Sequence, residues 1–162
     1  MSYSLNNKKT LRGDLTIPPD KSLSHRAVMF NSIAKGEARI SNFLMGEDCL
    51  STISVLRKLG VNIVVEGNNV FTYGKGIESL TPPKEILDVG NSGTTIRLMS
   101  GILAGRDFKC VLDGDSSIRK RPMNRIIKPL NMMGANISAK NNNENAPIEF
   151  NGGNLLDLDY DL

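Results

Sequence analysis

The sequence predicts a mixed α/β (α+β) fold made of repeated βαβαββ units, and two observations support this prediction. First, helix-like and strand-like patterns alternate along the chain and are joined by short turns. Second, residues 56–63 (LRKLGVNI) have a counterpart in residues 130–137 (LNMMGANI). Both segments read as a helix end closed by glycine and followed by an alternating strand, which indicates two copies of one unit. The alternative is a chance similarity between two βαββ segments.

The first unit is expected to cover about residues 11–81. Apolar side chains recur in its first helix at the spacing of a helix that buries one face, namely Leu23, Ala27, Phe30 and Ala34. Its second helix is expected to end at Gly60, and a tight hairpin at 67–69 is expected to join its last two strands. The expected elements are a strand at 11–17, a helix at 21–35, a strand at 38–44, the second helix, and strands starting near 61 and at 69.

The second unit is expected at about residues 84–153, after the proline pair at 82–83. Because proline suits the first position of a helix, the second helix of this unit is expected to begin at Pro122. Pro129 is expected either to bend this helix or to end its regular hydrogen-bond ladder. Residues 141–145 (NNNEN) are expected to form a polar hairpin tip. The other expected elements are a strand at 85–89, a helix at 92–104, a strand at 108–113, helix positions Met123, Ile126, Ile127 and Leu130 facing the core, and strands near 135–137 and at 147–152.

A third unit is expected to begin at residues 154–158, so that 154–162 form only its start. Each repeat normally buries a face against its neighbours, so a chain of two units and a fraction is expected to be a piece of a longer protein. Such a piece is expected to expose an apolar patch, and therefore to self-associate or to be only marginally stable.

The composition is that of a globular protein with a mild charge. The chain has 162 residues, of which 40% are hydrophobic, and its net charge is +3. This charge suits anionic small molecules and is low for a nucleic-acid-binding domain. His25 is the only histidine, and Cys49 and Cys110 lack metal-ligand spacing, which argues against zinc and for buried thiols in a reducing compartment. Without a membrane-length apolar run or a signal-peptide core, a cytoplasmic location is expected.

The first candidate anion site is the helix entrance within residues 19–26 (PDKSLSHR). Lys21 stands where free backbone N–H groups and the positive end of the helix dipole favour an anion. Ser22 and Arg26 are four residues apart, so they share a helix face that differs from the apolar one. These donors suit a phosphate or a carboxylate. The alternative is a solvated basic helix start with Asp20 as its cap.

The second candidate site is the turn at residues 90–95 (GNSGTT), between an expected strand and an expected helix. Gly93 has no Cβ, so backbone N–H groups can approach an anion closely. Asn91, Thr94 and Arg97 can add side-chain donors. The segment is not a Walker loop, and its alternative role is only to shape the turn from strand to helix.

The third candidate site is the basic segment 116–122 (SSIRKRP). Arg119, Lys120 and Arg121 precede an expected helix, where the dipole gives cations no stabilisation, so they are expected to face an anion. The alternative is a solvated basic loop. All three sites lie at helix entrances, which can converge on one edge of a layered repeat. Their convergence implies one or more ligands with several anionic groups.

Together these segments resemble the 5-enolpyruvylshikimate-3-phosphate synthases, also called 3-phosphoshikimate 1-carboxyvinyltransferases. The resemblance rests on residues 20–26 (DKSLSHR), 90–97 (GNSGTTIR), 113–115 (DGD) and 119–122 (RKRP), and it covers essentially the whole chain. It implies transfer of the enolpyruvyl group of phosphoenolpyruvate to the 5-hydroxyl of shikimate 3-phosphate, with release of phosphate. That reaction belongs to the shikimate pathway of aromatic amino-acid biosynthesis.

The resemblance also implies roles for single residues. Shikimate 3-phosphate is expected to contact Lys21, Ser22, Arg26 and Thr94. Phosphoenolpyruvate is expected to contact Lys21, Gly93 and Arg121, in a pocket that Asn91 shapes. Lys21 is in addition the expected catalytic residue, which shares the proton of the reacting hydroxyl. No metal or organic cofactor is expected, and glyphosate, the inhibitor of this family, is expected at the phosphoenolpyruvate position.

The implied architecture is the inside-out barrel of the enolpyruvyl transferases, in which two similar domains close like a clamp. Each domain has three βαβαββ units with the helices inside. Full-length members are expected to be monomers and are much longer than this chain, so a second domain with further acidic and basic residues is expected to be missing. The chain by itself is therefore expected to be inactive or nearly so.

Two other classes of protein are alternatives to a 5-enolpyruvylshikimate-3-phosphate synthase. The sister enzymes that act on UDP-N-acetylglucosamine usually carry a reactive cysteine in the third basic segment, whereas residues 115–119 (DSSIR) contain none and Cys110 lies within an expected strand. A non-catalytic module that binds RNA or protein is the other alternative. Against it, the basic residues cluster at helix entrances, and aromatic residues make up only 5% of the chain.

Overall fold

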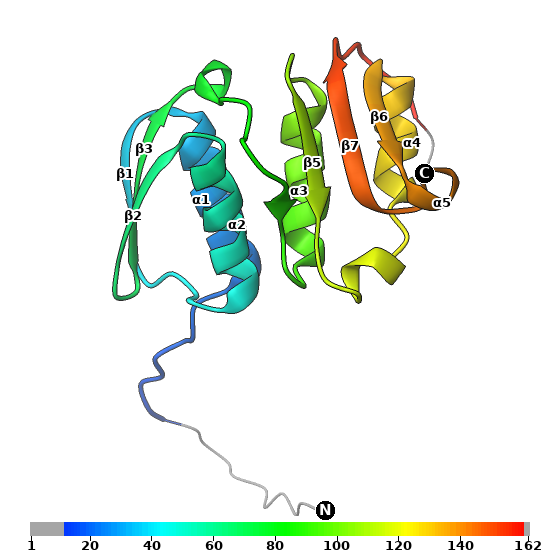
Figure 1. Cartoon of the computed structure of the whole chain (residues 1–162). Helices are drawn as coiled ribbons and strands as arrows, with labels where there is room; N and C mark the ends of the chain where they lie inside the picture. Colours follow the sequence, from blue (N-terminus) through cyan, green and yellow to red (C-terminus); the bar gives the residue numbers. More distant parts are fainter. Residues whose placement is uncertain (1–11, 161–162) are drawn as a thin grey trace, which may run out of the picture.

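The computed structural model describes residues 12–160, which form two halves lying side by side, each with a β-sheet and helices packed against it (Figure 1). The first half contains α1 (Lys21–Ile33), β1 (Lys35–Ile40), α2 (Glu47–Lys58), β2 (Asn62–Glu66), β3 (Asn69–Lys75) and the 3₁₀ turn η1 (Ile77–Ser79). The second half contains β4 (Leu87–Asp88), α3 (Gly93–Ala104), β5 (Lys109–Asp113), the 3₁₀ turn η2 (Ile118–Lys120), α4 (Asn124–Met132), β6 (Ala135–Ala139), α5 (Lys140–Asn143) and β7 (Asn145–Gly153). The predicted mixed α/β class is confirmed.

The two sheets repeat one topology. The first sheet has the strand order β1-β3-β2, and the second has the order β4-β5-β7-β6, so β5-β7-β6 repeats the first sheet strand for strand. Within each triplet the pairs are antiparallel, whereas β4 runs parallel to β5. The sequence repeat thus corresponds to a repeat of strand order, with β4 as an additional strand at the edge of the second sheet.

The strand predicted at 11–17 is wrong for the residues that the structure describes. Residues 12–17 form no strand, and Leu11 lies outside the described part of the chain. A strand requires a neighbour for its N–H and C=O groups, and no described strand pairs with this segment. The side chains of Leu15 and Ile17, which alternate as in a strand, are 86% and 70% exposed.

Several predicted boundaries are also wrong. Strand β1 lies within 35–40 instead of 38–44, because Asn42 takes a left-handed backbone conformation (φ 52°) that ends the extended segment. Strand β4 has two residues instead of five, since only Leu87 and Asp88 pair with β5. Helix α4 begins at Asn124 rather than at Pro122, because the turn η2 precedes it. Residues 154–158 form no strand.

Both predicted hairpin connections are present in the structure. Strands β2 and β3 are joined at Gly67, whose φ of 60° suits a residue without a Cβ. The polar segment near 141–145 connects β6 with β7, and it contains three consecutive asparagines with left-handed φ, at 141, 142 and 143. Asparagine tolerates this conformation better than most residues, so the composition of the tip and its geometry agree.

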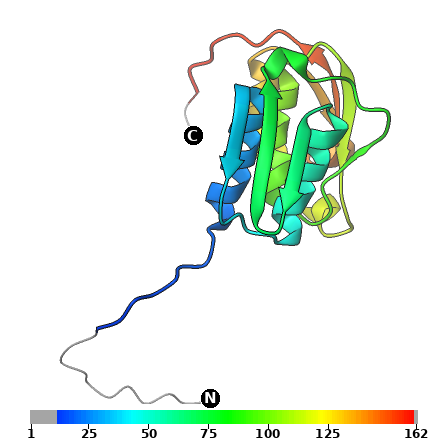
Figure 2. The ribbon, with the colours of Figure 1, turned by 90° about the vertical axis from the view of Figure 1, so that its left-hand side faces the viewer.

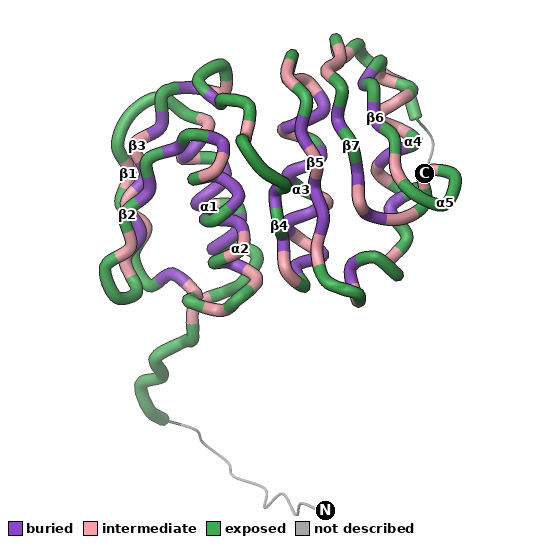
Figure 3. Tube along the Cα trace, viewed as in Figure 1, coloured by how far each residue is buried: buried purple, intermediate pink, exposed green. Residues whose placement is uncertain are grey.

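The helices form the inner layer of the molecule, and the sheets lie outside them. Figure 2 shows the first sheet from its outer face, with the helices behind it. Helix α2 packs against α1 on one side and α3 on the other, and α3 also packs against α4. Buried residues are concentrated on these helices and on the strands that face them (Figure 3). The largest fully buried side chains come from both halves and include Phe43, Leu56, Ile96, Met99, Leu112 and Phe150.

The apolar face predicted for α1 is not the face that is buried. Leu23 and Phe30 are 60% and 63% exposed. The side of α1 that packs against α2 and β3 instead carries Ser24, His25, Val28, Met29 and Ser32. Spacing alone identifies a stripe of apolar residues, but the fold decides which stripe meets a neighbour. The described part of the chain offers no partner to the stripe of Leu23 and Phe30.

All four longer helices run in the same direction, and their first turns point to the lower end of the molecule in Figure 1. For α2, α3 and α4 this arrangement follows from the topology, since each of them connects two strands that run toward that same end, whereas α1 precedes β1 and runs antiparallel to it. The unpaired N–H groups and positive dipole ends of the four helices are therefore gathered at one edge. Among residues 12–160, no helix has the length and apolar character needed to cross a membrane.

The exposed stripe of α1 predicts self-association of the chain. Replacing Leu23 and Phe30 together with glutamine is expected to raise the fraction of monomer, because the two side chains form exposed apolar surface on one helix face. Sedimentation velocity over a range of protein concentrations measures this fraction. Met132→Gln is the control, since Met132 is similarly exposed (54%) but lies on α4. A monomer fraction that is the same in wild type and in the double variant contradicts the prediction.

Candidate functional site

The entrance of α1 is organised by two carboxylates. Asp20 caps the helix, because its Oδ1 accepts a hydrogen bond of 2.7 Å from the backbone N–H of Leu23. The ammonium group of Lys21 forms an ion pair with Asp48, which lies in the first turn of α2. The side chain of Lys21 remains half exposed, so this ion pair orients the ammonium group without removing it from solvent. Sequence reasoning missed Asp48, because an acidic residue in a first helical turn is also explained by the helix dipole.

Ser22 and Arg26 lie together on the exposed side of the same entrance. Both residues are exposed, and Nε of Arg26 is 3.4 Å from the backbone carbonyl oxygen of Ser22. The prediction that they share a helix face is therefore correct. Arg26 forms no ion pair with any residue in the range 12–160, and no described contact joins it to the turn at 90–95.

The second site is a capped helix entrance. The hydroxyl of Ser92 accepts a hydrogen bond of 3.1 Å from the backbone N–H of Thr95, which makes Ser92 the N-cap of α3. The turn before it is held by Asp88, whose Oδ1 accepts from the N–H of Gly90 at 2.8 Å. Thr94 is half-buried in the first turn of the helix. The N–H of Ile96 donates to the carbonyl oxygen of Ser92 at 3.2 Å, so Ser92 pairs the N–H groups of Thr95 and Ile96 but not those of Gly93 and Thr94.

Gly93 and Arg121 are direct neighbours, which brings the second and third predicted sites together. A Cβ placed on Gly93 would lie 2.5 Å from Nη1 of Arg121, so the guanidinium occupies the space that a side chain would need. Nη2 of Arg121 donates a hydrogen bond of 2.8 Å to Oδ1 of Asn91. Asn91 therefore shapes this corner by orienting the arginine, and Gly93 permits the close approach.

Three arginines gather behind this corner. Burial lowers the pKa of Arg97 below its usual value, and the nearby positive charges of Arg125 and Arg121 lower it further. Nε of Arg97 is buried and has no hydrogen-bond partner among the described residues. The positive charges of these neighbouring arginines repel one another unless an anion lies between them. Arg125 was missed by sequence reasoning, although its position four residues after Arg121 is visible in the sequence.

Arg119 does not face this corner, which corrects one prediction. Its guanidinium binds the carboxylate of Asp113 through two hydrogen bonds, of 3.0 and 2.6 Å. Burial by itself raises the pKa of Asp113, but the hydrogen bonds from Arg119 and from the N–H of Gly114 outweigh it and lower that pKa below its usual value. Of the three basic residues in the third segment, only Arg121 contacts the second site. Lys120 is exposed.

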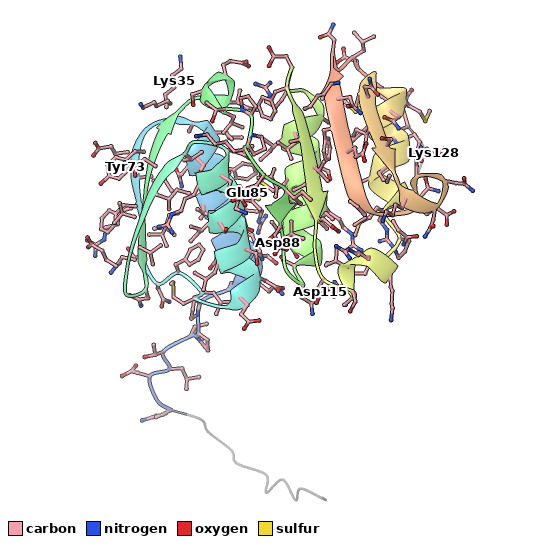
Figure 4. The ribbon with its side chains drawn as sticks, in the orientation of Figure 1. Lys35, Tyr73, Glu85, Asp88, Asp115 and Lys128 are labelled. Atoms are coloured by element: carbon pink, nitrogen blue, oxygen red, sulfur yellow. The ribbon has the colours of Figure 1, made fainter. Side chains whose placement is uncertain are left out.

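The DGD segment at 113–115 supports the second site. The N–H of Asp115 donates to the carbonyl oxygen of Gly90 at 2.9 Å, and a Cβ on Gly114 would collide with that same oxygen. The carboxylate of Asp115 accepts from the N–H groups of Ser117 and Ile118 at 2.8 and 2.9 Å. Figure 4 shows Asp88 and Asp115 near the lower end of the molecule. Both carboxylates hold backbone turns in place.

The carboxylates at this end do not form a metal site within residues 12–160. No group of three or more histidine, cysteine, aspartate or glutamate side chains in this range is close enough together to hold a metal ion. The two cysteines, Cys49 and Cys110, are buried and free, as the sequence predicted. Burial raises the pKa of Cys110 to about 12, so this thiol stays protonated at neutral pH.

A buried hydrogen-bond network lies beneath the first two sites. Nδ1 of His25 is 2.7 Å from the hydroxyl of Thr52, which is 2.7 Å from the hydroxyl of Thr95. The hydroxyl of Thr95 can in turn donate its hydrogen either to the hydroxyl of Ser92, at 2.7 Å, or to the carbonyl oxygen of Asp48, at 3.2 Å. The entrances of α1, α2 and α3 are thereby connected through Asp48 and this network. One continuous set of contacts therefore includes Lys21, Asn91, Gly93 and Arg121.

These features define a protein of repeated α/β units in which the entrances of parallel helices, with their basic side chains, meet at one edge. Comparisons with known proteins identify the family. The sequence profile of the EPSP synthases (3-phosphoshikimate 1-carboxyvinyltransferases) matches residues 5–162, and the chain belongs to this family.

Two curated relatives show how much of such a protein this chain represents. The 3-phosphoshikimate 1-carboxyvinyltransferase of Bacillus cytotoxicus is 54% identical over 158 residues, which are 98% of this chain and 37% of the relative. The corresponding protein of Alkaliphilus metalliredigens is 52% identical over 155 residues, which are 96% of this chain and 36% of the relative. A solved structure of EPSP synthase from Acinetobacter baumannii matches 91% of this chain and 34% of its own, with a TM-score of 0.87 and 43% identity. The chain therefore spans little more than a third of the length of these relatives.

Acidification is expected to destabilise the chain through His25. Burial lowers the pKa of His25 below the usual 6.5, and the charge of Lys21 lowers it further, while Asp48 opposes both. Below about pH 6.5 the unfolded chain therefore binds a proton that the folded chain does not. The free energy of unfolding is expected to keep its full value above that pH and to fall as the pH drops toward the folded-state pKa.

Urea unfolding at several pH values between about 7.5 and 5 tests this expectation. His25→Gln removes the titrating group and is expected to flatten the pH dependence in this window. The carboxylate of Asp113 contributes only at lower pH, because its pKa lies below 3.8. An equal loss of stability in wild type and in His25→Gln would show that His25 is not the responsible group.

Proposed function

We propose that this chain forms a phosphate-binding part of an enzyme that transfers the enolpyruvyl group of phosphoenolpyruvate to the 5-hydroxyl of shikimate 3-phosphate, with release of phosphate. The observation that carries the proposal is the gathering of Arg97, Arg121 and Arg125 beside the N-terminus of α3, where Nε of Arg97 is buried without a partner among the described residues. Both substrates carry phosphate groups, which such a cluster neutralises through charge-assisted hydrogen bonds. The family membership supports the same reaction.

Each substrate is assigned its own set of contacts at the helix entrances, and both sets include Lys21. Shikimate 3-phosphate is assigned to the entrance of α1 and the first turn of α3, with contacts to Lys21, Ser22, Arg26 and Thr94. The exposure of Ser22 and Arg26 on one face supports this assignment. Phosphoenolpyruvate is assigned to the corner of Lys21, Asn91, Gly93 and Arg121. The hydrogen bond from Arg121 to Asn91, together with the close approach of the Arg121 guanidinium to Gly93, supports this second assignment.

The chemistry proposed for these residues is electrostatic. The 5-hydroxyl oxygen attacks C2 of phosphoenolpyruvate and gives up its proton while C3 gains a proton; the tetrahedral intermediate then loses phosphate from C2 and a proton from C3, which restores the C=C bond of the enolpyruvyl group. Oriented cations stabilise the phosphate charges throughout, without a covalent enzyme intermediate. Lys21 is assigned the catalytic role of sharing the proton of the attacking hydroxyl, and its ion pair with Asp48 fixes the direction of the ammonium group.

Turnover is assigned to the longer protein rather than to these 162 residues alone. The chain spans 37% of its Bacillus cytotoxicus relative, so the remaining part of that relative has no counterpart here. We therefore propose that the chain binds shikimate 3-phosphate weakly and shows no phosphate release by itself. A chimera in which residues 5–162 replace the matching segment of the Bacillus cytotoxicus protein, hereafter the chimera, is the form in which activity is measured.

Arg26→Ala is expected to abolish binding of shikimate 3-phosphate to the 162-residue chain. Arg26 is exposed and contributes a charge rather than core packing, so the fold is expected to remain intact. Calorimetric titration measures the affinity, and circular dichroism checks the fold. Arg39→Ala is the matched control, because it removes the same charge from β1, where Arg39 lies over the ring of Phe71. Equal affinities of wild type and Arg26→Ala would exclude the assignment.

Gly93→Ala is expected to weaken inhibition of the chimera by glyphosate much more than it changes the KM for shikimate 3-phosphate. The added methyl group has to displace the guanidinium of Arg121, since the two would lie 2.5 Å apart. The phosphoenolpyruvate corner is therefore disturbed, while the entrance of α1 is not. Steady-state kinetics with each substrate varied in turn separates the two effects. Gly101→Ala is the control, because a Cβ at Gly101 meets open space. Unchanged inhibition in Gly93→Ala would place the inhibitor elsewhere.

A further inference from the structure

Thr52 lies at the centre of the buried network that connects three helices. It is on α2, between His25 of α1 and Thr95 of α3, and its hydroxyl is 2.7 Å from a polar atom of each. All three side chains are fully buried, as is Ser92 at the end of the network. Valine has nearly the same shape as threonine, so the hydroxyl group is what distinguishes Thr52 from an apolar residue at this buried position. The hydroxyl therefore adds direction and not volume.

The hydrogen atoms of the network give it a definite order. Each hydroxyl has one hydrogen to donate, so Thr52 can donate either to His25 or to Thr95, and not to both. If Nδ1 of His25 carries the ring hydrogen, it donates to Thr52, which donates to Thr95, which donates either to the hydroxyl of Ser92 or to the carbonyl oxygen of Asp48. This order leaves Nε2 as an acceptor without a partner among the described residues. The opposite order leaves an N–H group unpaired there, which is the rarer and costlier state.

The network lies one helical turn farther along α1 and α2 than Lys21 and Asp48, which form the ion pair at the helix entrances. His25 follows Lys21 by one turn on α1, and Thr52 follows Asp48 by one turn on α2. The ion pair of Lys21 with Asp48 and the hydrogen bond of His25 with Thr52 therefore form two successive links between the same two helices. On the other side, Thr95 directly follows Thr94 and is the residue whose N–H is capped by Ser92. Thr52 thus connects the entrance of α1 to the entrance of α3.

We propose that Thr52 is a positioning residue, which sets the distance between the substrate groups of α1 and those of α3 by acting through His25 and Thr95. It touches neither substrate in this assignment. The inference rests on the proposed function for its kinetic consequence, whereas its structural consequence is independent of any ligand. Reactions between two bound substrates depend steeply on their separation, so a small shift of α3 relative to α1 affects the rate.

Nuclear magnetic resonance on the 162-residue chain tests the structural consequence. Thr52→Val removes the hydroxyl and keeps the shape, and it is expected to shift the amide resonances of Gly93 and Thr94. It is also expected to change the ring ¹⁵N shifts of His25, which are read without ambiguity because the chain has one histidine. Thr52→Ser restores the hydroxyl and is expected to restore both signals. Thr72→Val is the matched control, because Thr72 is equally buried but its hydroxyl has no partner among the described residues.

Steady-state kinetics of the chimera tests the functional consequence. Thr52→Val is expected to lower kcat/KM for phosphoenolpyruvate by roughly 10- to 100-fold, which is the size of effect that a misplacement of about 1 Å produces. The KM for shikimate 3-phosphate is expected to change little, since its main contacts are assigned to α1. Thr52→Ser is expected to recover most of the activity, and Thr72→Val to keep all of it. Simple loss of stability affects both substrates alike and does not give this pattern.

The outcomes separate this inference from the proposed function. If the unsubstituted chimera is inactive, the proposed function fails, while the resonance experiment still decides whether Thr52 positions α3. If Thr52→Val leaves Gly93, Thr94 and the His25 ring unchanged, or if Thr52→Ser behaves like Thr52→Val, the positioning role is overturned. Thr95→Val breaks the same link from the other side and replaces Thr52→Val if that variant does not fold. It is expected to shift the His25 ring signals, and unchanged ring signals would also overturn the inference.

Discussion

The common direction of the four longer helices is the constraint on which the candidate site depends. Because α1 to α4 all run in one direction, the positive ends of four helix dipoles and their unpaired N–H groups meet at one edge. Such an edge attracts anions before any side chain is considered. The cations of Lys21, Arg97 and Arg121 add to a field that the backbone has already established, and they lie where the dipole opposes them. A bound anion relieves both kinds of repulsion.

The carboxylates at this edge are distributed so that part of the positive charge stays uncompensated. Asp48 pairs with Lys21, and Asp113 pairs with Arg119 through two hydrogen bonds. Asp20, Asp88 and Asp115 accept hydrogen bonds from backbone N–H groups and hold the cap of α1 and two turns. Arg97, by contrast, has only like-charged groups among the causes that shift its pKa, besides burial. The acidic groups of this edge thus hold backbone turns or pair with Lys21 and Arg119, and within residues 12–160 none of them is paired with Arg97.

Local sequence patterns predicted what depends on neighbouring residues. The repeated helix ends at Gly60 and Gly134, the hairpin at Gly67 and the glycine turn before α3 were all predicted, because backbone conformation is set locally there. Features that depend on distant segments were missed. The buried face of α1, the pairing of Arg119 with Asp113 and the ion pair of Lys21 with Asp48 all require knowledge of which elements meet. The strand expected at 11–17 failed for the same reason, since a strand exists only with a partner.

The contact between Gly93 and Arg121 has a consequence for how this site can change over evolutionary time. The guanidinium fills the volume that a side chain at position 93 would occupy, so the two positions compete for one small space. Any enlargement at 93 has to be matched by a rearrangement of residue 121, although the two are far apart in the sequence. Selection at either position therefore acts on the pair. A side chain larger than hydrogen at position 93 requires the end of the flexible Arg121 side chain to move, and this movement changes the direction in which the guanidinium points.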